Sequence, residues 1–339
     1  MTRVVGTDPG TSSLDVILLV DGSTAAQARF LPQQIAGGVH ELLDLLQNWS
    51  PLDLIAAPSG YGLPLIRGDR LTEDHIDQMS LIRLEERGRS SGVIGLRSMA
   101  RSLAASGFPV VFLPGGFHLP TIPAHRKAGS VDLGTADKVC VAALALWANG
   151  QHTGTPFENS TFAVVEVGSA FTAVLVVAGG RLVDAACGTR GPIGLRSRGL
   201  WDGEMAYWLC PLSKSDLFRG GLEDLGELGP AAFRESLTKH LAGLRAVTAF
   251  ETIYLSGEGL KRPEILEIAT AAAAEVGRPV PLPSLPGTWV KHAAQGSALL
   301  ADALAGGIHS ELARALELES AAGELWSVLA RPRGSVSRI

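Results

Sequence analysis

Hydrophobic and polar positions near the start of the chain follow first a strand period and then a helix period. Apolar residues dominate RVVGTD and SLDVILLVDG, which predicts two strands around a Gly/Ser/Thr loop. GGVHELLDLLQNWS spaces its leucines as on one face of a helix, and LDLIAAPSG is an apolar run closed by a turn. The pattern therefore predicts strand, loop, strand, helix and strand, in that order.

The same patterns continue to the far end of the chain. TEDHIDQMSLIRLEERG predicts a helix, FPVVFLPGG a strand, and DLGTADKVCVAALALWANG a helix that ends at Asn149-Gly150. After the linker QHTGTPFENS, FAVVEVGSAFTAVLVVAGGRLVDAA repeats the opening strand, Gly/Ser/Thr turn and strand. ETIYLSGEGLKRPEI then predicts a strand and a Gly turn, ILEIATAAAAEVG and HAAQGSALLADALAGG predict helices, and RPVPLPSLPG between them is a Pro-rich connection.

Because each half begins with the same pattern of strand, Gly/Ser/Thr turn and strand, the sequence predicts two related domains. We place the first at residues 1–150, completed by residues 308–339, and the second at residues 151–307. A length of 339 residues agrees with about two domains. The small residues of DKVCVAALA and HAAQGSALLA would let the two helices cross closely between the domains, as a hinge for cleft closure.

Composition narrows the function classes. The formal charge of -5 and the lack of a basic stripe argue against a nucleic-acid partner. No apolar run reaches about 18 residues and the start has no leader pattern, so we expect a cytoplasmic protein without a membrane partner. Three widely spaced cysteines indicate neither a disulfide framework nor a thiolate zinc site, and we expect them to be buried.

The first Gly/Ser/Thr loop is a candidate phosphate site. Glycine lets backbone N–H groups approach phosphate oxygens, and hydroxyl groups add donors, so we assign this role to Gly10, Thr11, Ser12 and Ser13. Asp8 at the end of the preceding strand could orient a hydrated Mg²⁺ ion. A strand follows the loop and the Walker lysine is missing, which excludes a Walker loop and a dinucleotide fingerprint. An ordinary hairpin turn is the alternative.

The two later Gly turns raise the expectation of a nucleotide. Phosphoryl transfer depends on clamping a nucleotide tail and excluding water, and a second loop in the second half can supply the other side of the clamp. The turn in LSGEGLK could carry a purine and ribose on its backbone. The residues assigned to the nucleotide in these two turns are Gly168, Ser169, Thr172, Ser256, Gly257 and Gly259.

The order of these motifs, over roughly residues 3–307, resembles the acetate and sugar kinase/Hsp70/actin (ASKHA) superfamily. DPGTSSLD is similar to the N-P-G-S-T-S-T-K and N-A-G-S-S-S-L-K openings of butyrate and acetate kinases. FLPGGFH followed by GTADK resembles F-D-T-A-F-H followed by G-T-S-H-K. The chain is also similar to an uncharacterised group of predicted butyrate kinases. The resemblance implies an α/β fold of two ribonuclease-H-like (actin-like ATPase) domains around a nucleotide cleft, with ATP and Mg²⁺ as cofactors.

The resemblance also implies roles for single residues. Arg196 falls at the arginine that contacts the transferred phosphoryl group in carboxylate kinases, and Arg198 is the neighbouring candidate. His118 matches the histidine of F-D-T-A-F-H, with a structural, hydrogen-bonded histidine as the alternative. Glu166 falls where sugar kinases carry an acidic residue, and Asp137 joins Asp8 as a candidate metal ligand.

Several positions depart from the carboxylate-kinase pattern. The loop lysine of that pattern is Asp15 here, and the Asp of F-D-T-A-F-H is Leu113. The histidine pair falls on Leu133 and Asp137, and the acidic residues near the last helix fall on Thr288, Trp289 and Lys291. Metal handling must therefore differ from that family.

The resemblance favours an ATP-dependent phosphotransferase acting on a small carboxylate. Two alternatives stay open: a non-catalytic nucleotide-binding or regulatory protein, and a kinase for a hydroxyl group of a small metabolite. The partner in each enzyme hypothesis is a small-molecule substrate. The oligomeric state is open, and a homodimer is one possible assembly.

Overall fold

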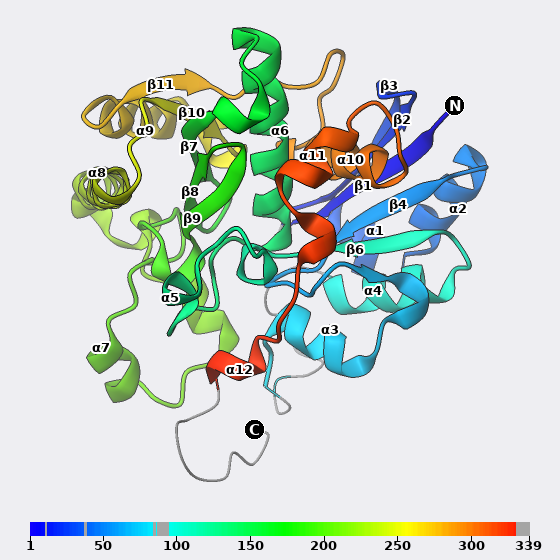
Figure 1. Cartoon of the computed structure of the whole chain (residues 1–339). Helices are drawn as coiled ribbons and strands as arrows, with labels where there is room; N and C mark the ends of the chain where they lie inside the picture. Colours follow the sequence, from blue (N-terminus) through cyan, green and yellow to red (C-terminus); the bar gives the residue numbers. More distant parts are fainter. Residues whose placement is uncertain (11, 37–38, 84–85, 87–94, 330–339) are drawn as a thin grey trace.

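The computed structural model describes residues 1–10, 12–36, 39–83, 86 and 95–329, and two β-sheets form its frame (Figure 1). The first sheet has the strand order β3-β2-β1-β4-β6-β5. β1 pairs antiparallel with β2 and parallel with β4. Its strands are β1 (Arg3–Pro9), β2 (Leu14–Val20), β3 (Ser23–Phe30), β4 (Leu54–Pro58), β5 (Ile66–Arg67) and β6 (Val110–Leu113).

The second sheet repeats this arrangement. Its order is β11-β10-β7-β8-β9, in which β7 pairs antiparallel with β8 and parallel with β10. The hairpin β1–β2 therefore corresponds to β7–β8, and the predicted repetition of an α/β unit is confirmed. The strands are β7 (Thr161–Val167), β8 (Thr172–Ala178), β9 (Arg181–Ala186), β10 (Thr252–Ser256) and β11 (Arg278–Pro281).

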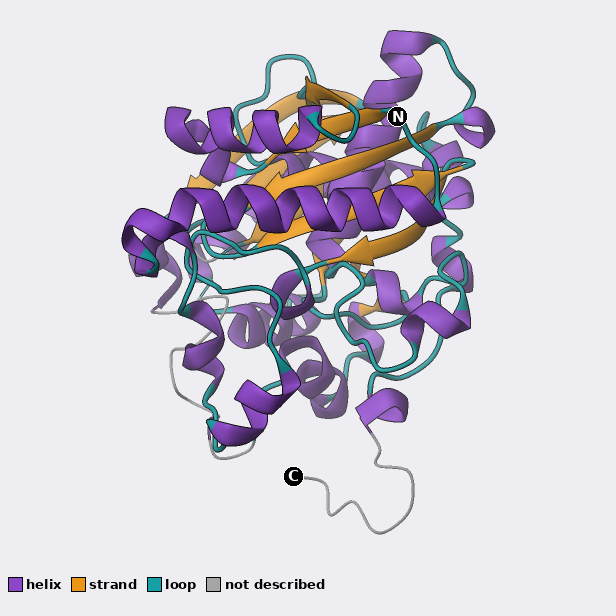
Figure 2. Cartoon of the chain, turned by 90° about the vertical axis from the view of Figure 1, so that its left-hand side faces the viewer, coloured by secondary structure: helices purple, strands orange, loops and turns teal. Residues whose placement is uncertain are grey.

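Helices cover the outer face of each sheet and fill the space between the two. α2, α3 and α4 pack on the outer face of the first sheet, and α8 and α9 cover that of the second, where they lie in front of its strands in Figure 2. α6 and α10 lie in the middle. The α-helices are α1 (Pro32–Ala36), α2 (His40–Trp49), α3 (Glu73–Ser80), α4 (Leu96–Ala105), α5 (Ala124–Lys127), α6 (Ala136–Thr153), α7 (Gly203–Trp208), α8 (Gly229–Val247), α9 (Pro263–Ala274), α10 (His292–Leu304), α11 (Ser310–Ala315) and α12 (Trp326–Leu329).

Alternation along the first strand of each half distributes its side chains between two cores. Val4 faces the central core with α6 and α10, while Val5 faces the outer helices. Val164 and Val165 divide in the same way in the second half. Because both faces of each sheet are covered, these strands appear in the sequence as continuous apolar runs.

The two central helices cross closely, as their small residues predict. A Cβ atom on Gly296 of α10 would lie 1.8 Å from the carbonyl oxygen of Cys140 in α6, and one on Gly6 of β1 would lie 2.2 Å from the backbone nitrogen of Ala298. Only glycine permits these approaches. Thus α10 packs on β1 and α6 at once, and its N-terminus is fixed relative to the first sheet. A hinge role for the crossing stays a prediction.

Several boundaries differ from the sequence-based expectations. The helix predicted by TEDHIDQMSLIRLEERG ends at Ser80, where Leu81 adopts φ 45°, and part of the remainder lies outside the described residues. α6 continues past Gly150 to Thr153. The carbonyl of Gly150 accepts a hydrogen bond from the N–H of Gly154, and the helix ends at Gly154, which has φ 65°.

Other elements were not predicted at all. The Pro-rich connection contains strand β11, an edge strand whose alternate prolines need no partner on the open side. The sequence pattern also did not identify α4 and α8. Cys140 and Cys187 are buried as expected, but Cys210 is exposed.

The domain limits at residues 150 and 307 stay a prediction. The second-domain range includes α10, which packs against β1 and β4 of the first sheet. In the part of the chain that the structure describes, no helix is long and apolar enough to cross a membrane. The cytoplasmic location stays a prediction as well.

Candidate active site

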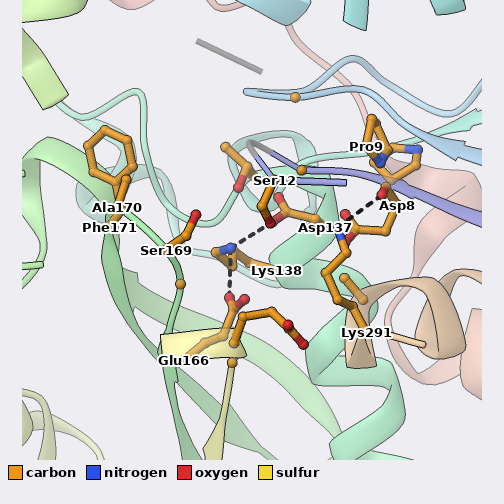
Figure 3. Close-up of a pocket in the computed structure, with 18 of the residues that line it drawn as sticks. Asp8, Pro9, Ser12, Asp137, Lys138, Glu166, Ser169, Ala170, Phe171 and Lys291 are labelled. Atoms are coloured by element: carbon orange, nitrogen blue, oxygen red, sulfur yellow. Dashed lines mark hydrogen bonds and ion pairs between the residues drawn. The ribbon is translucent and has the colours of Figure 1, made fainter. Parts of the chain in front are cut away.

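A cavity of about 890 Å³ lies between the two halves of the molecule. Residues of both hairpin loops line it, together with the N-termini of α6 and α10 and the turn after β10 (Figure 3). Strand β4 of the first sheet and strand β10 of the second sheet both end at this cavity, since their last residues, Pro58 and Ser256, line it. The repetition of the fold thus brings the two predicted phosphate loops to one site.

The two loops are closed by the same backbone hydrogen bond. The N–H of Gly10 donates to the carbonyl of Ser13 at 2.9 Å, and the N–H of Gly168 donates to the carbonyl of Phe171 at 2.9 Å. Each loop joins strands at the last pair of a hairpin ladder. Thr11 of the first loop lies outside the described residues, so its predicted phosphate contact stays a prediction.

The acid that precedes the first loop is bound by a lysine. The Asp8 carboxylate lies 2.7 Å from the ammonium group of Lys291, which also donates to the carbonyls of Asp8 at 3.2 Å and Ser13 at 3.0 Å. Burial raises the pKa of Asp8, an effect that Lys291 opposes. Lys291 is the residue that precedes α10. The packing of this helix fixes Lys291 beside the first loop.

A second lysine joins one acid from each half. The Lys138 ammonium on α6 lies 2.6 Å from a carboxylate oxygen of Asp137 and 2.6 Å from one of Glu166 on β7 (Figure 3). Although burial acts against its charge, these two acids hold the pKa of Lys138 well above its usual range. Burial raises the pKa of Glu166, while at Asp137 the lysine outweighs burial and lowers the pKa.

Asp15, which departs from the carboxylate-kinase pattern, anchors the first loop from behind. Its fully buried carboxylate accepts hydrogen bonds from Arg29 at 2.6 and 2.9 Å, from the Ser13 hydroxyl at 2.8 Å and from the backbone N–H of Lys291 at 2.8 Å. These bonds outweigh the effect of burial and lower the pKa of Asp15. The Ser13 hydroxyl is therefore engaged inside the protein.

The turn after β10 packs directly on the second loop. Gly257 has φ 110°, and a Cβ atom there would lie 2.2 Å from the carbonyl of Val167. A Cβ atom on Gly259 would lie 2.8 Å from the Val167 side chain. Both glycines are therefore required by this close contact. The Ser256 hydroxyl lies 2.8 Å from Nδ1 of His292, and burial lowers the pKa of that histidine to about 4.

Some of the residues that line the cavity are positively charged or aromatic. Lys214 lies 4.5 Å from the centre of the Tyr61 ring and donates to the Tyr61 hydroxyl at 3.2 Å. Arg97 also lines the cavity and pairs with Asp77 at 2.8 Å. Phe171 and Phe218, which line the cavity, stack edge to face with 4.8 Å between their ring centres. Such a lining suits a small anion with an apolar part.

Asp132 is a buried acid on the cavity wall that the sequence analysis did not assign to the site. It is 6% exposed, and a Cβ atom on Gly188 would lie 2.0 Å from its carboxylate. Burial raises its pKa to about 6, so its carboxylate can exchange a proton near neutral pH. Its place before the α6 N-terminus was the available signal, but a single aspartate in a turn is too common to stand out.

The structure brings most of the predicted residues to the cavity, though not all of them. Those that line it are Asp8, Gly10, Ser12, Asp137, Glu166, Gly168, Ser169, Ser256 and Gly257. The predicted residues outside the lining are Ser13, Thr172, Gly259, His118, Arg196 and Arg198. The assignments themselves stay predictions, since no ligand contact tests them.

The three predicted catalytic residues outside the lining have other contacts. Arg196 donates to the carbonyl of Ser169 at 3.2 Å, so it adjoins the second loop without lining the cavity. Arg198 stacks over Trp201 at 4.9 Å. His118 is buried, with Nδ1 3.0 Å from the carbonyl of Gly323, which agrees with its structural alternative.

The donor set does not match the predicted Mg²⁺ site. Asp8 and Asp137 offer carboxylate oxygens of a suitable type, but an ammonium group already binds each of them. Among the described residues, no three His, Cys, Asp or Glu side chains are grouped to hold a metal ion. A cation placed between these acids would have to displace Lys291 or Lys138.

The chain belongs to a protein family described as "Protein of unknown function (DUF1464)", which residues 6–330 match. No curated protein matches the sequence.

Solved structures share the fold. An acetate kinase from Entamoeba histolytica is similar with a TM-score of 0.55 and 11% identity, over 81% of this chain and 87% of that one. A propionate kinase from Francisella tularensis has a TM-score of 0.56 and 13% identity, over 82% and 89% of the two chains. A Listeria monocytogenes protein provisionally assigned as an N-acetylmannosamine kinase has a TM-score of 0.51 and 14% identity, over 88% and 97%. The chain thus has the two-domain α/β fold of carboxylate and sugar kinases, and the predicted fold class is confirmed.

Proposed function

We propose that this chain is an ATP-dependent phosphotransferase whose acceptor is a small carboxylate, as the resemblance to acetate and butyrate kinases suggests. The observation that carries the proposal is the pair of equivalent hairpin loops, one from each half, that line a single cavity. Clamping the phosphates from two sides would align the terminal phosphoryl group and exclude water. The turn at Ser256 and Gly257 would lie beside the adenosine.

The positive charges in the cavity lining favour a carboxylate acceptor. Lys214 and Arg97 would attract a carboxylate group, and Phe171 and Phe218 would contact a short aliphatic chain. A carboxylate is already anionic near neutral pH, so its attack on the terminal phosphorus needs no general base. In this mechanism Arg196, which adjoins the second loop, would reach the transferred group only after a movement of that loop.

Asp132 favours a second candidate, a kinase for a hydroxyl group. A hydroxyl acceptor must lose its proton during attack, and an acid with a pKa of about 6 on the cavity wall suits a general base. Glu166 suits this role less, because Lys138 binds it.

The test is turnover of ATP, with and without Mg²⁺, against short-chain carboxylates and small alcohols. ADP release and acyl-hydroxamate formation are followed together, and Asp132→Asn is assayed in parallel. A carboxylate kinase forms hydroxamate, and the variant changes its kcat less than about threefold. A hydroxyl kinase forms none, and the variant loses about a hundredfold or more. Saturable ATP binding without turnover on any acceptor would favour the non-catalytic alternative.

A further inference from the structure

Two lysines occupy related places beside the two loops. Asp8 and Glu166 each stand two residues before the first glycine of their loop, and each is paired with a lysine near the start of a central helix. Lys291 precedes α10, and Lys138 lies in the first turn of α6. The internal repetition of the fold therefore repeats an acid–lysine pair on each side of the cavity.

Lys291 also accounts for two departures noted separately in the sequence. Asp15 stands where a loop lysine was expected, and Lys291 stands where an acidic residue was expected. The structure brings the two together, since the Lys291 N–H donates to Asp15 at 2.8 Å. Lys291 then places its ammonium group inside the first loop, 2.6 Å from where a Cβ atom of Gly10 would lie. The positive charge of the loop is kept, but it comes from another element.

Both lysine side chains are mostly shielded from solvent and line the cavity. The Lys291 side chain is 11% exposed and the Lys138 side chain 17%. The carboxylates of Asp8, Asp137 and Glu166 contact these two charges. Lys138 contacts two carboxylates, so its third N–H donor can bind a phosphate oxygen, whereas Lys291 must exchange one of its three contacts for a phosphate oxygen.

We propose that Lys291 and Lys138 bind the phosphates of the nucleotide directly, and that these fixed charges replace a divalent ion held by Asp8 and Asp137. The proposal rests on the nucleotide binding of the proposed function. A divalent ion at those carboxylates would face two ammonium groups at contact distance, and Coulomb repulsion opposes that arrangement. Nucleotide affinity should therefore depend little on divalent cations.

The first measurement uses the unmodified protein. ATP binding is measured by calorimetry in excess EDTA and in excess Mg²⁺ at equal ionic strength. We expect the two dissociation constants to agree within about threefold. A Mn²⁺ titration of the protein alone, followed by the electron paramagnetic resonance of the free ion, should show no stoichiometric site. Affinity more than about tenfold tighter with Mg²⁺, or a stoichiometric Mn²⁺ site, would overturn the proposal.

The second measurement removes one lysine with its acid, so that no buried charge is left alone. The double variant Asp8→Asn/Lys291→Met should bind ATP in EDTA at least about tenfold more weakly, because it loses a charge-assisted contact. Lys291→Arg keeps the charge and should recover most of the affinity. Lys239→Met on the exposed face of α8 is the matched control and should bind as the unmodified protein does. Unchanged affinity in the double variant would contradict the role of Lys291.

The outcomes separate this inference from the proposed function. ATP binding that requires Mg²⁺ overturns the inference and leaves the phosphotransferase proposal standing. Absence of ATP binding under both conditions overturns both. ATP binding in EDTA without turnover supports the inference and contradicts only the proposal that the protein is a phosphotransferase.

Discussion

The two loops of the cavity share one backbone design but are anchored in different ways. Behind the first loop, Asp15 joins Ser13, Arg29 and Lys291 in a buried network. The residue at the corresponding ladder position of the second hairpin is Ala173, which has no polar group to offer. The second loop is instead held from the side, where Phe171 stacks on Phe218.

This difference teaches that a repeated fold fixes loop geometry but not loop rigidity. Asp8 and Asp15, on either side of the first loop, both bind Lys291 at the start of α10, one through an ion pair and one through a charged hydrogen-bond acceptor. The second loop is held by neutral contacts, namely the Phe171–Phe218 ring contact and the hydrogen bonds that the backbone N–H groups of Arg196 and Ser197 donate to the carbonyl of Ala170 at 3.1 Å, and by the Arg196 side chain. Its contacts therefore include fewer ionic groups than those of the first loop. We therefore expect the second loop to move when the cavity closes.

The largest expected effect comes from removing the anchor of the first loop. Asp15→Ala leaves Arg29 and the Ser13 hydroxyl without their acceptor, and we expect the free energy of unfolding to fall by about 3 kcal/mol or more. Chemical denaturation measures this loss. Glu235→Ala, on the exposed face of α8, is the control and should not change the midpoint. A loss below about 1 kcal/mol would show that the network does not anchor the loop.

The N-terminus of α10 offers a second test of the contrast between the two halves, because two neighbouring residues there contact opposite halves. Lys291 binds the first loop, whereas His292 binds Ser256 and Ser284 of the second half. The pKa of His292 is about 4 in the fold and 6.5 for an ordinary histidine, so the unfolded chain takes up the proton first. Its contribution to stability is therefore complete above pH 6.5 and is lost as the pH falls toward 4.

The expected loss from this one group is about 3 kcal/mol between pH 7 and pH 4. Denaturation curves of the unmodified protein and of His292→Gln at both pH values measure it as the difference between the two pH dependences. Parallel pH dependences would mean that His292 does not stay neutral in the fold.

The smallest expected effect concerns the second loop. A double-mutant cycle of Phe171→Ala and Phe218→Ala should give a coupling energy of about 1 kcal/mol, typical of an edge-to-face pair. Unfolding free energies of the two single variants and the double variant measure it. If the losses of unfolding free energy in the two single variants add up to that of the double variant, the aromatic contact does not restrain this loop. The contrast with the first loop would then rest on Asp15 alone.

Local patterns predicted much of the fold because they depend on neighbouring residues. The apolar runs around each Gly/Ser/Thr turn predicted both hairpins, and small residues predicted the close crossing of α6 and α10. The pattern failed at β11, where strand pairing with β10 outweighs the low strand propensity of its prolines. It also failed at the end of α6, where tertiary packing outweighs the cost of Gly150 in a helix.

The sequence by itself determined which loops could hold phosphate and that they occur once in each half, because glycine, hydroxyl groups and strand periodicity are local properties. Only the tertiary structure decided which charges meet. Lys291 and Asp15 lie 276 residues apart in the sequence yet form a direct contact, and Lys138 reaches acids from both halves. Ion pairs of this kind act through space, so no single stretch of sequence carries them. The packing of two central helices places both lysines beside the loops.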